Sequence, residues 1–73
     1  MEIFGIPVEV EHDGDSWLVT DYEINMYGVG DTVGEAIEEY KSVVQEYLAE
    51  LEKDESILGR HLRKHLEYLR GLL

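Results

Sequence analysis

The residues best suited to chemistry are three glycines, Gly28, Gly30 and Gly34, which stand where an apolar run gives way to a helical pattern. Glycine-rich turns before a helix often bind phosphate, because bare backbone N–H groups and the helix N-terminus both attract anions. A phosphate loop also needs a nearby Lys or Arg, yet this turn contains Asp31 and the nearest base is Lys41. We therefore expect the glycines to serve backbone geometry, in a kinked strand and a tight strand-to-helix corner.

Two histidines four residues apart, His61 and His65, could present a metal-binding pair from one face of a helix. A zinc site needs a third ligand, and the one other histidine, His12, falls in a distant predicted turn. The HExxH pattern of metalloproteases is absent, because Leu62 stands where the pattern needs a Glu, with Arg63 and Lys64 at its two variable positions. We interpret the two histidines as surface residues of a basic helix and expect no metal and no other cofactor.

The remaining polar residues show no arrangement of nucleophile and base. The chain contains no cysteine, which excludes disulfides and thiolate–zinc sites. Its three serines, Ser16, Ser42 and Ser56, lack activating neighbours in the sequence. The many acids offer no pair that can be assigned as general acid and general base. The sequence therefore predicts a protein that is not an enzyme.

Charge is distributed unevenly along the 73 residues, whose net charge is −11. Residues 1–56 hold 16 acids and two bases, a net −14, whereas residues 57–73 hold four bases and one acid, a net +3. Binding a polyanion needs Lys and Arg to displace its counterions, so we expect no nucleic-acid partner. Two interpretations stay open: a solvated acidic surface partly neutralised by a basic tail helix, or an acidic face that attracts a basic protein.

The elements that must position these residues are three strands and two helices. Apolar residues at even positions from Phe4 to Val10 predict a first strand, in which Pro7 marks an edge or a bulge. Asp13-Gly14 suits the tight turn of a hairpin. Further strands are predicted over residues 16–22 and 24–29, so that the strands occupy about residues 3–30 as an antiparallel meander.

A capping box predicts where the first helix begins. The Thr32 hydroxyl should accept a hydrogen bond from the N–H of Glu35, and the Glu35 carboxylate should reach back to the N–H of Thr32. Apolar spacing then predicts a helix over residues 33–52 and a C-terminal helix over residues 57–72. The sequence thus predicts a single α+β domain over residues 1–73, a three-stranded antiparallel β-meander followed by two helices in the order β-β-β-α-α.

The corner Gly30-Asp31-Thr32-Val33-Gly34-Glu35-Ala36-Ile37 resembles the HicB-like antitoxin family, in which a G-D-T-x-x-E-A corner opens a long helix. The resemblance covers roughly residues 6–50, and Asn25 falls where that family has a glycine at positive φ. It implies a partial ribonuclease-H-like fold without catalytic residues. It also implies a protein partner, a small basic ribonuclease toxin of the HicA kind whose active surface the antitoxin covers. The leucine-striped C-terminal helix stands where many relatives carry a fourth strand or a DNA-binding module.

Self-association is the last expectation. The C-terminal helix carries a leucine stripe that must be buried either against the first helix or against a second subunit, and we expect a homodimer. The stripe consists of Leu58, Leu62, Leu66, Leu69 and Leu73, widened by Leu72. We expect no membrane partner and a cytoplasmic protein, because no apolar run approaches the ~20 residues of a membrane span. A stand-alone homo-oligomeric scaffold remains the alternative to an antitoxin.

Overall fold

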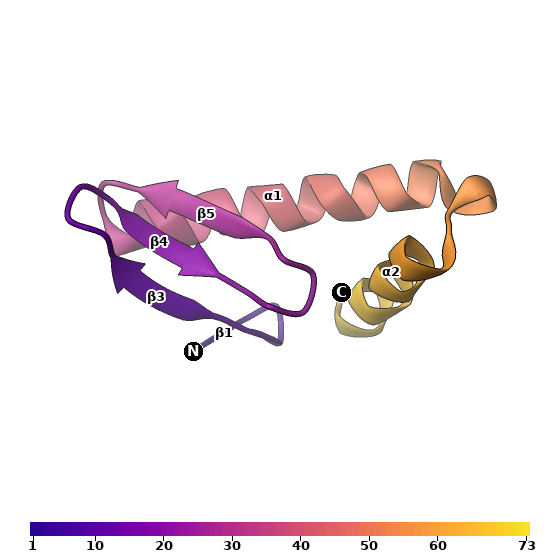
Figure 1. Cartoon of the computed structure of the whole chain (residues 1–73), viewed down its shortest axis with the longest axis horizontal. Helices are drawn as coiled ribbons and strands as arrows, with labels where there is room; N and C mark the ends of the chain where they lie inside the picture. Colours follow the sequence, from indigo (N-terminus) through magenta and orange to yellow (C-terminus); the bar gives the residue numbers. More distant parts are fainter.

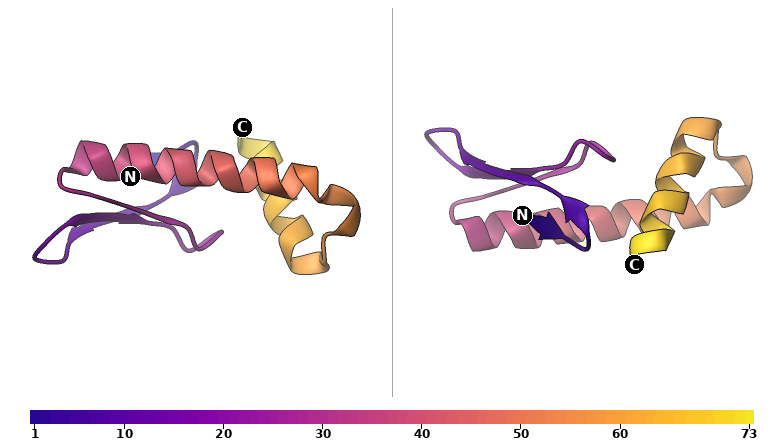
Figure 2. Two further views of the ribbon diagram at one scale, coloured as in Figure 1. Left: turned by 90° about the horizontal axis from the view of Figure 1, so that it is seen from above. Right: turned by 90° about the horizontal axis from the view of Figure 1, so that it is seen from below.

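The computed structural model describes all residues from Met1 to Leu73 and has the predicted α+β architecture. The strands are β1 (Glu2–Ile3), β2 (Ile6–Pro7), β3 (Glu9–His12), β4 (Trp17–Thr20) and β5 (Tyr27–Gly30). The helices are α1 (Val33–Lys53) and α2 (Arg60–Leu72), joined by a 3-10 turn over Glu55–Ile57 (Figure 1). Strands β3, β4 and β5 form the antiparallel three-stranded sheet, and α1 forms a second layer over one of its faces (Figure 2).

The segment before the sheet differs from the single strand predicted over residues 4–10. Ile3 pairs with Ile6 in a separate hairpin, β1–β2, whose two strands have two residues each. The first strand of the three-stranded sheet begins only at Glu9. Both turn residues of the hairpin have positive φ, 57° at Phe4 and 83° at Gly5. A type I′ turn needs this backbone, which Gly adopts freely and Phe rarely does, so Phe-Gly gives little signal for a hairpin.

The sheet is the predicted meander, but its third strand is shorter and later than expected. The first turn is tight, with Gly14 at φ 102° and the Asp13 carboxylate accepting hydrogen bonds from the N–H groups of Asp15 and Ser16. The prediction of a strand over residues 24–29 was wrong in its start, because residues 21–26 form a closed loop and β5 occupies residues 27–30.

Glycines in β5 allow α1 to lie directly against the strand backbone. A Cβ at Gly28 would stand 2.4 Å from the Ala36 carbonyl oxygen and 2.4 Å from the Tyr40 nitrogen. A Cβ at Gly30 would stand 2.5 Å from the Ala36 nitrogen. Neither glycine has a positive φ. The physical need for glycine here is therefore close approach of two backbones rather than the kinked strand that the sequence suggested.

Helix α1 is longer than the sheet that it covers, which explains where α2 packs. Its 21 residues span about 32 Å at ~1.5 Å per residue, whereas a strand of four residues spans about 13 Å. Helix α2 folds back below the part of α1 that projects beyond the sheet (Figures 1 and 2). A Cβ at Gly5 would lie 3.1 Å from the Leu72 side chain, so the last turn of α2 also reaches the β1–β2 turn.

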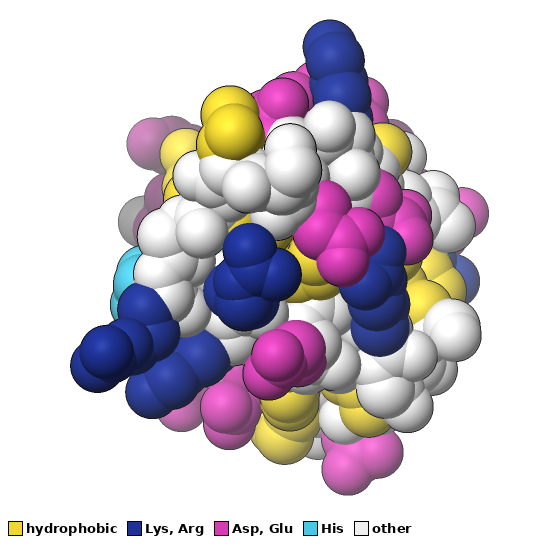
Figure 3. All heavy atoms as spheres, turned by 90° about the vertical axis from the view of Figure 1, so that its right-hand side faces the viewer, with side chains coloured by type: hydrophobic (Ala, Val, Ile, Leu, Met, Phe, Trp, Pro, Cys, Tyr) yellow, Lys and Arg dark blue, Asp and Glu magenta, His cyan; other side chains and the backbone are white.

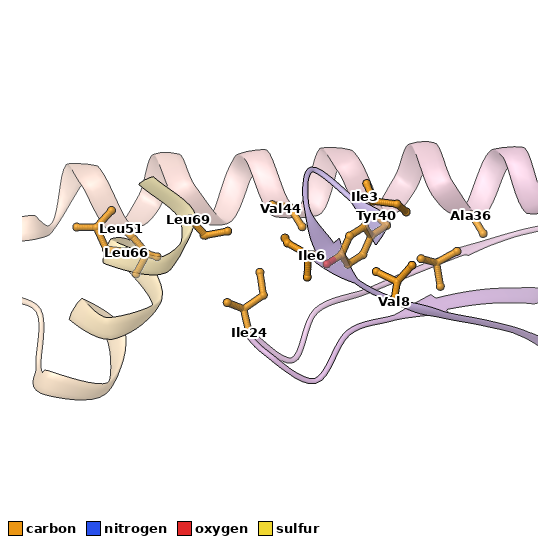
Figure 4. Close-up of a cluster of buried hydrophobic side chains, with 11 residues drawn as sticks. Ile3, Ile6, Val8, Ile24, Ala36, Tyr40, Val44, Leu51, Leu66 and Leu69 are labelled. Atoms are coloured by element: carbon orange, nitrogen blue, oxygen red, sulfur yellow. The ribbon is translucent and has the colours of Figure 1, made fainter. Parts of the chain in front are cut away.

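A single hydrophobic core joins the two parts of the molecule (Figure 4). Between the sheet and α1 it contains Val19, Ala36 and Tyr40, all with exposed fractions of 0%. Below the projecting half of α1 it continues through Leu51 to Leu66 and Leu69 of α2. The short hairpin adds Ile3 and Ile6, and the loop before β5 adds Ile24. Neither helix is long and apolar enough to cross a membrane.

Candidate protein-binding surface

The strand-to-helix corner is a helix cap, as the sequence predicts. Thr32 is the N-cap of α1, and its hydroxyl oxygen accepts a hydrogen bond from the N–H of Glu35 at 3.1 Å. The reciprocal bond differs by one residue, because the Glu35 carboxylate accepts from the N–H of Asp31 (3.1 Å) instead of Thr32. Of the corner residues, Thr32 and Glu35 thus supply side-chain acceptors for the N–H groups of Glu35 and Asp31, and Gly30 lies close to the first turn of α1.

Asp21 is a buried carboxylate that the sequence analysis did not single out. It is 1% exposed, the only buried residue with a charged side chain. Its Oδ1 accepts hydrogen bonds from the N–H groups of residues 23, 24 and 25 at 2.9, 2.7 and 3.1 Å. Its Oδ2 accepts from the N–H of Met26 (3.2 Å) and from the Tyr40 hydroxyl (2.7 Å). All five partners are donors, so this side chain closes the 21–26 loop and has no access to a solvent-borne ligand.

The loop that Asp21 closes determines the backbone conformation of Asn25 and the position of the Tyr40 side chain. Asn25 has φ 59°, in line with the expectation that Asn stands where positive φ is needed. Tyr40 projects from α1 into the loop, and burial together with the hydrogen bond to Asp21 raises the pKa of its phenol far above the ordinary value of 10.0. This hydrogen bond joins residues 19 positions apart and fixes the loop that precedes β5 to the N-terminal half of α1.

The two histidines of α2 do share a face, but they contact a tyrosine instead of a third ligand. The rings of His61 and His65 lie 4.7 Å apart, and the Tyr47 hydroxyl of α1 lies 2.6 Å from Nδ1 of His65. Burial, and then the neighbouring His61, lowers the pKa of His65 below 6.5. His12 sits at the β3–β4 turn, where its Nδ1 accepts from the N–H of Gly14. No three His, Cys, Asp or Glu side chains are grouped to hold a metal ion.

The leucine stripe of the C-terminal helix is divided between the core and the surface. Leu66 and Leu69 are 1% and 0% exposed within one chain, so they cannot take part in an interface while α2 stays folded back. Leu58 is partly buried against the core. Leu62 and Leu73 are 39% and 49% exposed. Self-association through this stripe stays a prediction, and in this fold only the exposed leucines can carry it.

The basic residues of α2 lie partly against acids of the same chain. Arg70 donates from Nη1 and Nη2 to the two carboxylate oxygens of Glu55, at 2.9 and 2.7 Å, and its Nε lies 3.5 Å from Glu52. These hydrogen bonds hold the pKa of Glu55 below its ordinary value. Figure 3 shows Lys and Arg side chains among Asp and Glu at this end of the molecule. The basic tail helix therefore neutralises part of the acidic surface locally.

The face of the sheet opposite α1 is not covered by any element (Figures 1 and 2). By the register of the strands, this outer sheet face consists of two cross-strand rows, Glu9–Thr20–Tyr27 and Glu11–Leu18–Val29. Tyr27 is 60% and Val29 39% exposed, and Tyr22 beside them is 67% exposed. The Tyr22 hydroxyl donates to the Glu9 carboxylate at 3.3 Å. Exposed aromatic and apolar side chains thus stand beside glutamates on one open surface.

No protein-family model, no curated protein and no solved structure matches this chain. The resemblance to HicB-like antitoxins therefore stays a prediction that rests on the corner residues and on the order of the elements.

Proposed function

We propose that this chain is a non-catalytic protein-binding module of the HicB antitoxin type, which neutralises a small basic ribonuclease of the HicA kind. The observation that supports the proposal is the uncovered outer sheet face, with Tyr22, Tyr27 and Val29 exposed beside Glu9 and Glu11. Tyrosine is enriched in protein interfaces, because its ring supplies apolar contact and its hydroxyl a hydrogen bond. Carboxylates around such a patch select a basic partner and accelerate its association.

The test begins with the DNA beside the gene, where the proposal expects a short reading frame for a basic protein. The two purified proteins are then mixed in a ribonuclease assay, and the chain should suppress RNA cleavage at a fixed stoichiometry. Binding measured by calorimetry should weaken as salt concentration rises, because surface charges are screened over about 10 Å at 0.1 M salt.

A matched pair of variants locates the interface. The Tyr22→Ser/Tyr27→Ser double variant should lose suppression, because it removes the two exposed rings from the outer sheet face. Ile57→Ser is the control, since Ile57 is 79% exposed at the opposite end of the molecule, in the turn between the helices. Full suppression by the double variant, or the lack of any ribonuclease partner encoded nearby, would refute the proposal.

The alternative is a homo-oligomeric scaffold without a toxin partner. It is favoured by apolar residues exposed at the α2 end, where Ile57, Leu62 and Leu73 remain uncovered. Sedimentation equilibrium of the wild type and of Leu62→Glu separates the two functions. A monomeric wild type removes the scaffold, whereas a mass that falls to that of the monomer in Leu62→Glu supports the scaffold when the ribonuclease assay also finds no partner. Leu69 is unsuitable for this test, because a charge there would disrupt the core of a single chain.

A further inference from the structure

The free edge of β5 lacks the charged residues and prolines that discourage a sheet edge from pairing with another strand. β3 and β5 are the two edge strands of the sheet. β3 carries Glu9 and Glu11 and follows Pro7, and charges and proline at an edge discourage pairing with other chains. β5 reads Tyr-Gly-Val-Gly and has neither charge nor proline. Of the two edges, β5 is therefore the one open to an additional strand.

The register of the sheet shows which backbone groups of β5 face that edge. The N–H of Asp21 donates to the carbonyl of Met26 at 3.1 Å, so these two residues form a hydrogen-bonded pair of the antiparallel ladder. Hydrogen-bonded and non-hydrogen-bonded pairs alternate along such a ladder. The N–H and C=O groups of Gly28 and Gly30 consequently point to β4, whereas those of Tyr27 and Val29 point to the free edge. An incoming strand would find two donors and two acceptors there.

A groove lies beside the same edge, between the start of β5 and the flank of α1. Its volume is about 280 Å³, and its lining residues are Asn25, Met26, Tyr27, Glu39 and Val43. Side chains of an added strand alternate between the two faces of the sheet. One set would enter this groove, and the other would extend the outer sheet face next to Tyr27 and Val29.

We propose that the free edge of β5 binds an extended basic segment of a partner protein, which joins the sheet as a fourth strand. The inference rests on the proposed function for the basic character of the partner. Within the groove, a lysine can lay its aliphatic stem along Val43 and bring its ammonium group to Glu39. On the other face, apolar side chains of the segment would pack beside Val29. The segment recognised is thus one in which basic and apolar residues alternate.

A second copy of this chain is a poorer occupant of the edge. Antiparallel pairing of two β5 strands would place Gly28 and Gly30 of the second copy toward the groove, and glycines leave it unfilled. The helices also interfere, because each α1 lies directly over its own Gly28. Paired strands are about 4.8 Å apart, whereas packed helices need about 8–10 Å between their axes. Two chains of net charge −11 would in addition repel one another.

The first experiment uses a short peptide of alternating Lys and Val as the probe and the full chain labelled for amide NMR. Binding should shift the amide signals of residues 27–30 and of Glu39 and Val43. Hydrogen exchange at Tyr27 and Val29 should slow at least about tenfold, because their N–H groups become hydrogen-bonded. A peptide of alternating Glu and Val should not bind. A Lys–Val peptide N-methylated at the residues that pair with β5 should bind much more weakly.

Three variants then separate the backbone of the edge from its side chains. Val29→Pro removes a free-edge donor without removing a bond to β4, and it should weaken peptide binding about tenfold. Val29→Ala keeps the N–H and should bind within about threefold of the wild type, since it loses only side-chain contact. His12→Pro places a proline at the free edge of β3 and should bind as the wild type does. Circular dichroism confirms that each variant is folded, and a misfolded Val29→Pro is replaced by the N-methylated peptide as the test.

Two results would overturn the inference. One is equal affinity of Val29→Pro and the wild type. The other is slow exchange at Tyr27 and Val29 in the free protein that depends on concentration, which would assign the edge to a second copy. The proposed function has a separate readout. A basic ribonuclease that is suppressed equally by wild type and Val29→Pro keeps the function and refutes this docking mode. Peptide binding at β5 in the absence of any ribonuclease partner keeps this docking mode and refutes the proposed function.

Discussion

Loss of the hydrogen bond from the Tyr40 hydroxyl to the Asp21 carboxylate should lower the free energy of unfolding by about 2 kcal/mol. A hydrogen bond to a charged group contributes about 1.5–3 kcal/mol. The substitution is Tyr40→Phe, which keeps the ring in the core. The lost bond is 2.7 Å long and joins two side chains that are 0% and 1% exposed. The carboxylate would keep its four backbone donors, so the loop should stay closed.

The more disruptive change is Asp21→Asn, which has nearly the same shape. One of its oxygens becomes an NH₂ group that points at donors, and the remaining partners lose a charged acceptor. The N–H of Met26 would be left without an acceptor, which costs about 1–3 kcal/mol, and the other N–H partners would exchange a charged acceptor for a neutral one, so the total loss is roughly 3–5 kcal/mol. A domain of this length is stable by roughly 4–11 kcal/mol, at ~0.05–0.15 kcal/mol per residue. Asp21→Asn should therefore leave a marginal or unfolded protein, whereas Tyr40→Phe should remain folded.

Urea denaturation followed by circular dichroism measures both values, and Tyr22→Phe is the matched control. Tyr22 also donates to a carboxylate, that of Glu9, but it is 67% exposed and the bond is 3.3 Å long. Its loss should change stability by less than about 0.5 kcal/mol. Thermal unfolding should show a decrease of roughly 8–16 °C for Tyr40→Phe, at ~4–8 °C per kcal/mol. Equal costs for the two Tyr→Phe variants would refute the reasoning.

Three further predictions concern the corner, the strand and the histidine pair. In urea titrations, Gly28→Ala should destabilise the fold by about 1–3 kcal/mol, because its Cβ meets the backbone of α1. Gly34→Ala should stabilise α1 by up to about 1 kcal/mol, because its Cβ would lie 3.9 Å from the Thr32 hydroxyl oxygen and meet nothing closer. Thr32→Ala should cost about 1 kcal/mol through loss of the N-cap, without changing partner binding. His65 has a lowered pKa in the folded state, so the unfolded chain binds more protons below pH 6.5. Stability should then fall from pH 7 to pH 5 relative to His65→Gln, and parallel curves for the two proteins would contradict this.

The parts of the fold that local signals determine were predictable from the sequence. The capping box placed the start of α1, and the spacing of apolar residues gave both helices within a few residues of their observed ends. Apolar residues at even positions from Phe4 to Val10 indicated one buried face, and Ile6 and Val8 are buried. The β1–β2 hairpin was missed because Phe is an unfavourable residue at positive φ. Phe4 keeps this conformation while it packs against the core, and no local sequence pattern predicts that packing.

The candidate site was only partly predictable, for a related reason. The acidic charge is visible in the composition, and one of the two interpretations of that charge was that it attracts a basic protein. The position of β5 was not visible, because it depends on Asp21, whose side chain closes the preceding loop and reaches Tyr40 on α1. A local Asx turn could have been inferred at Asp21, but the contact with a residue 19 positions away could not. A strand that begins three residues later exposes different backbone groups at the sheet edge.

The two glycines of β5 connect the stability of the fold to the surface proposed for binding. Because they carry no Cβ, α1 lies over the edge strand itself and not over the centre of the sheet. That position puts Glu39 and Val43 beside the free edge and forms the groove. The same position leaves no room for the helix of a second copy. The β5 glycines of that copy would also leave the groove unfilled. A larger residue at Gly28 would move the helix and the groove together, so the helix–strand contact and the selectivity of the edge for an extended basic segment have the same cause.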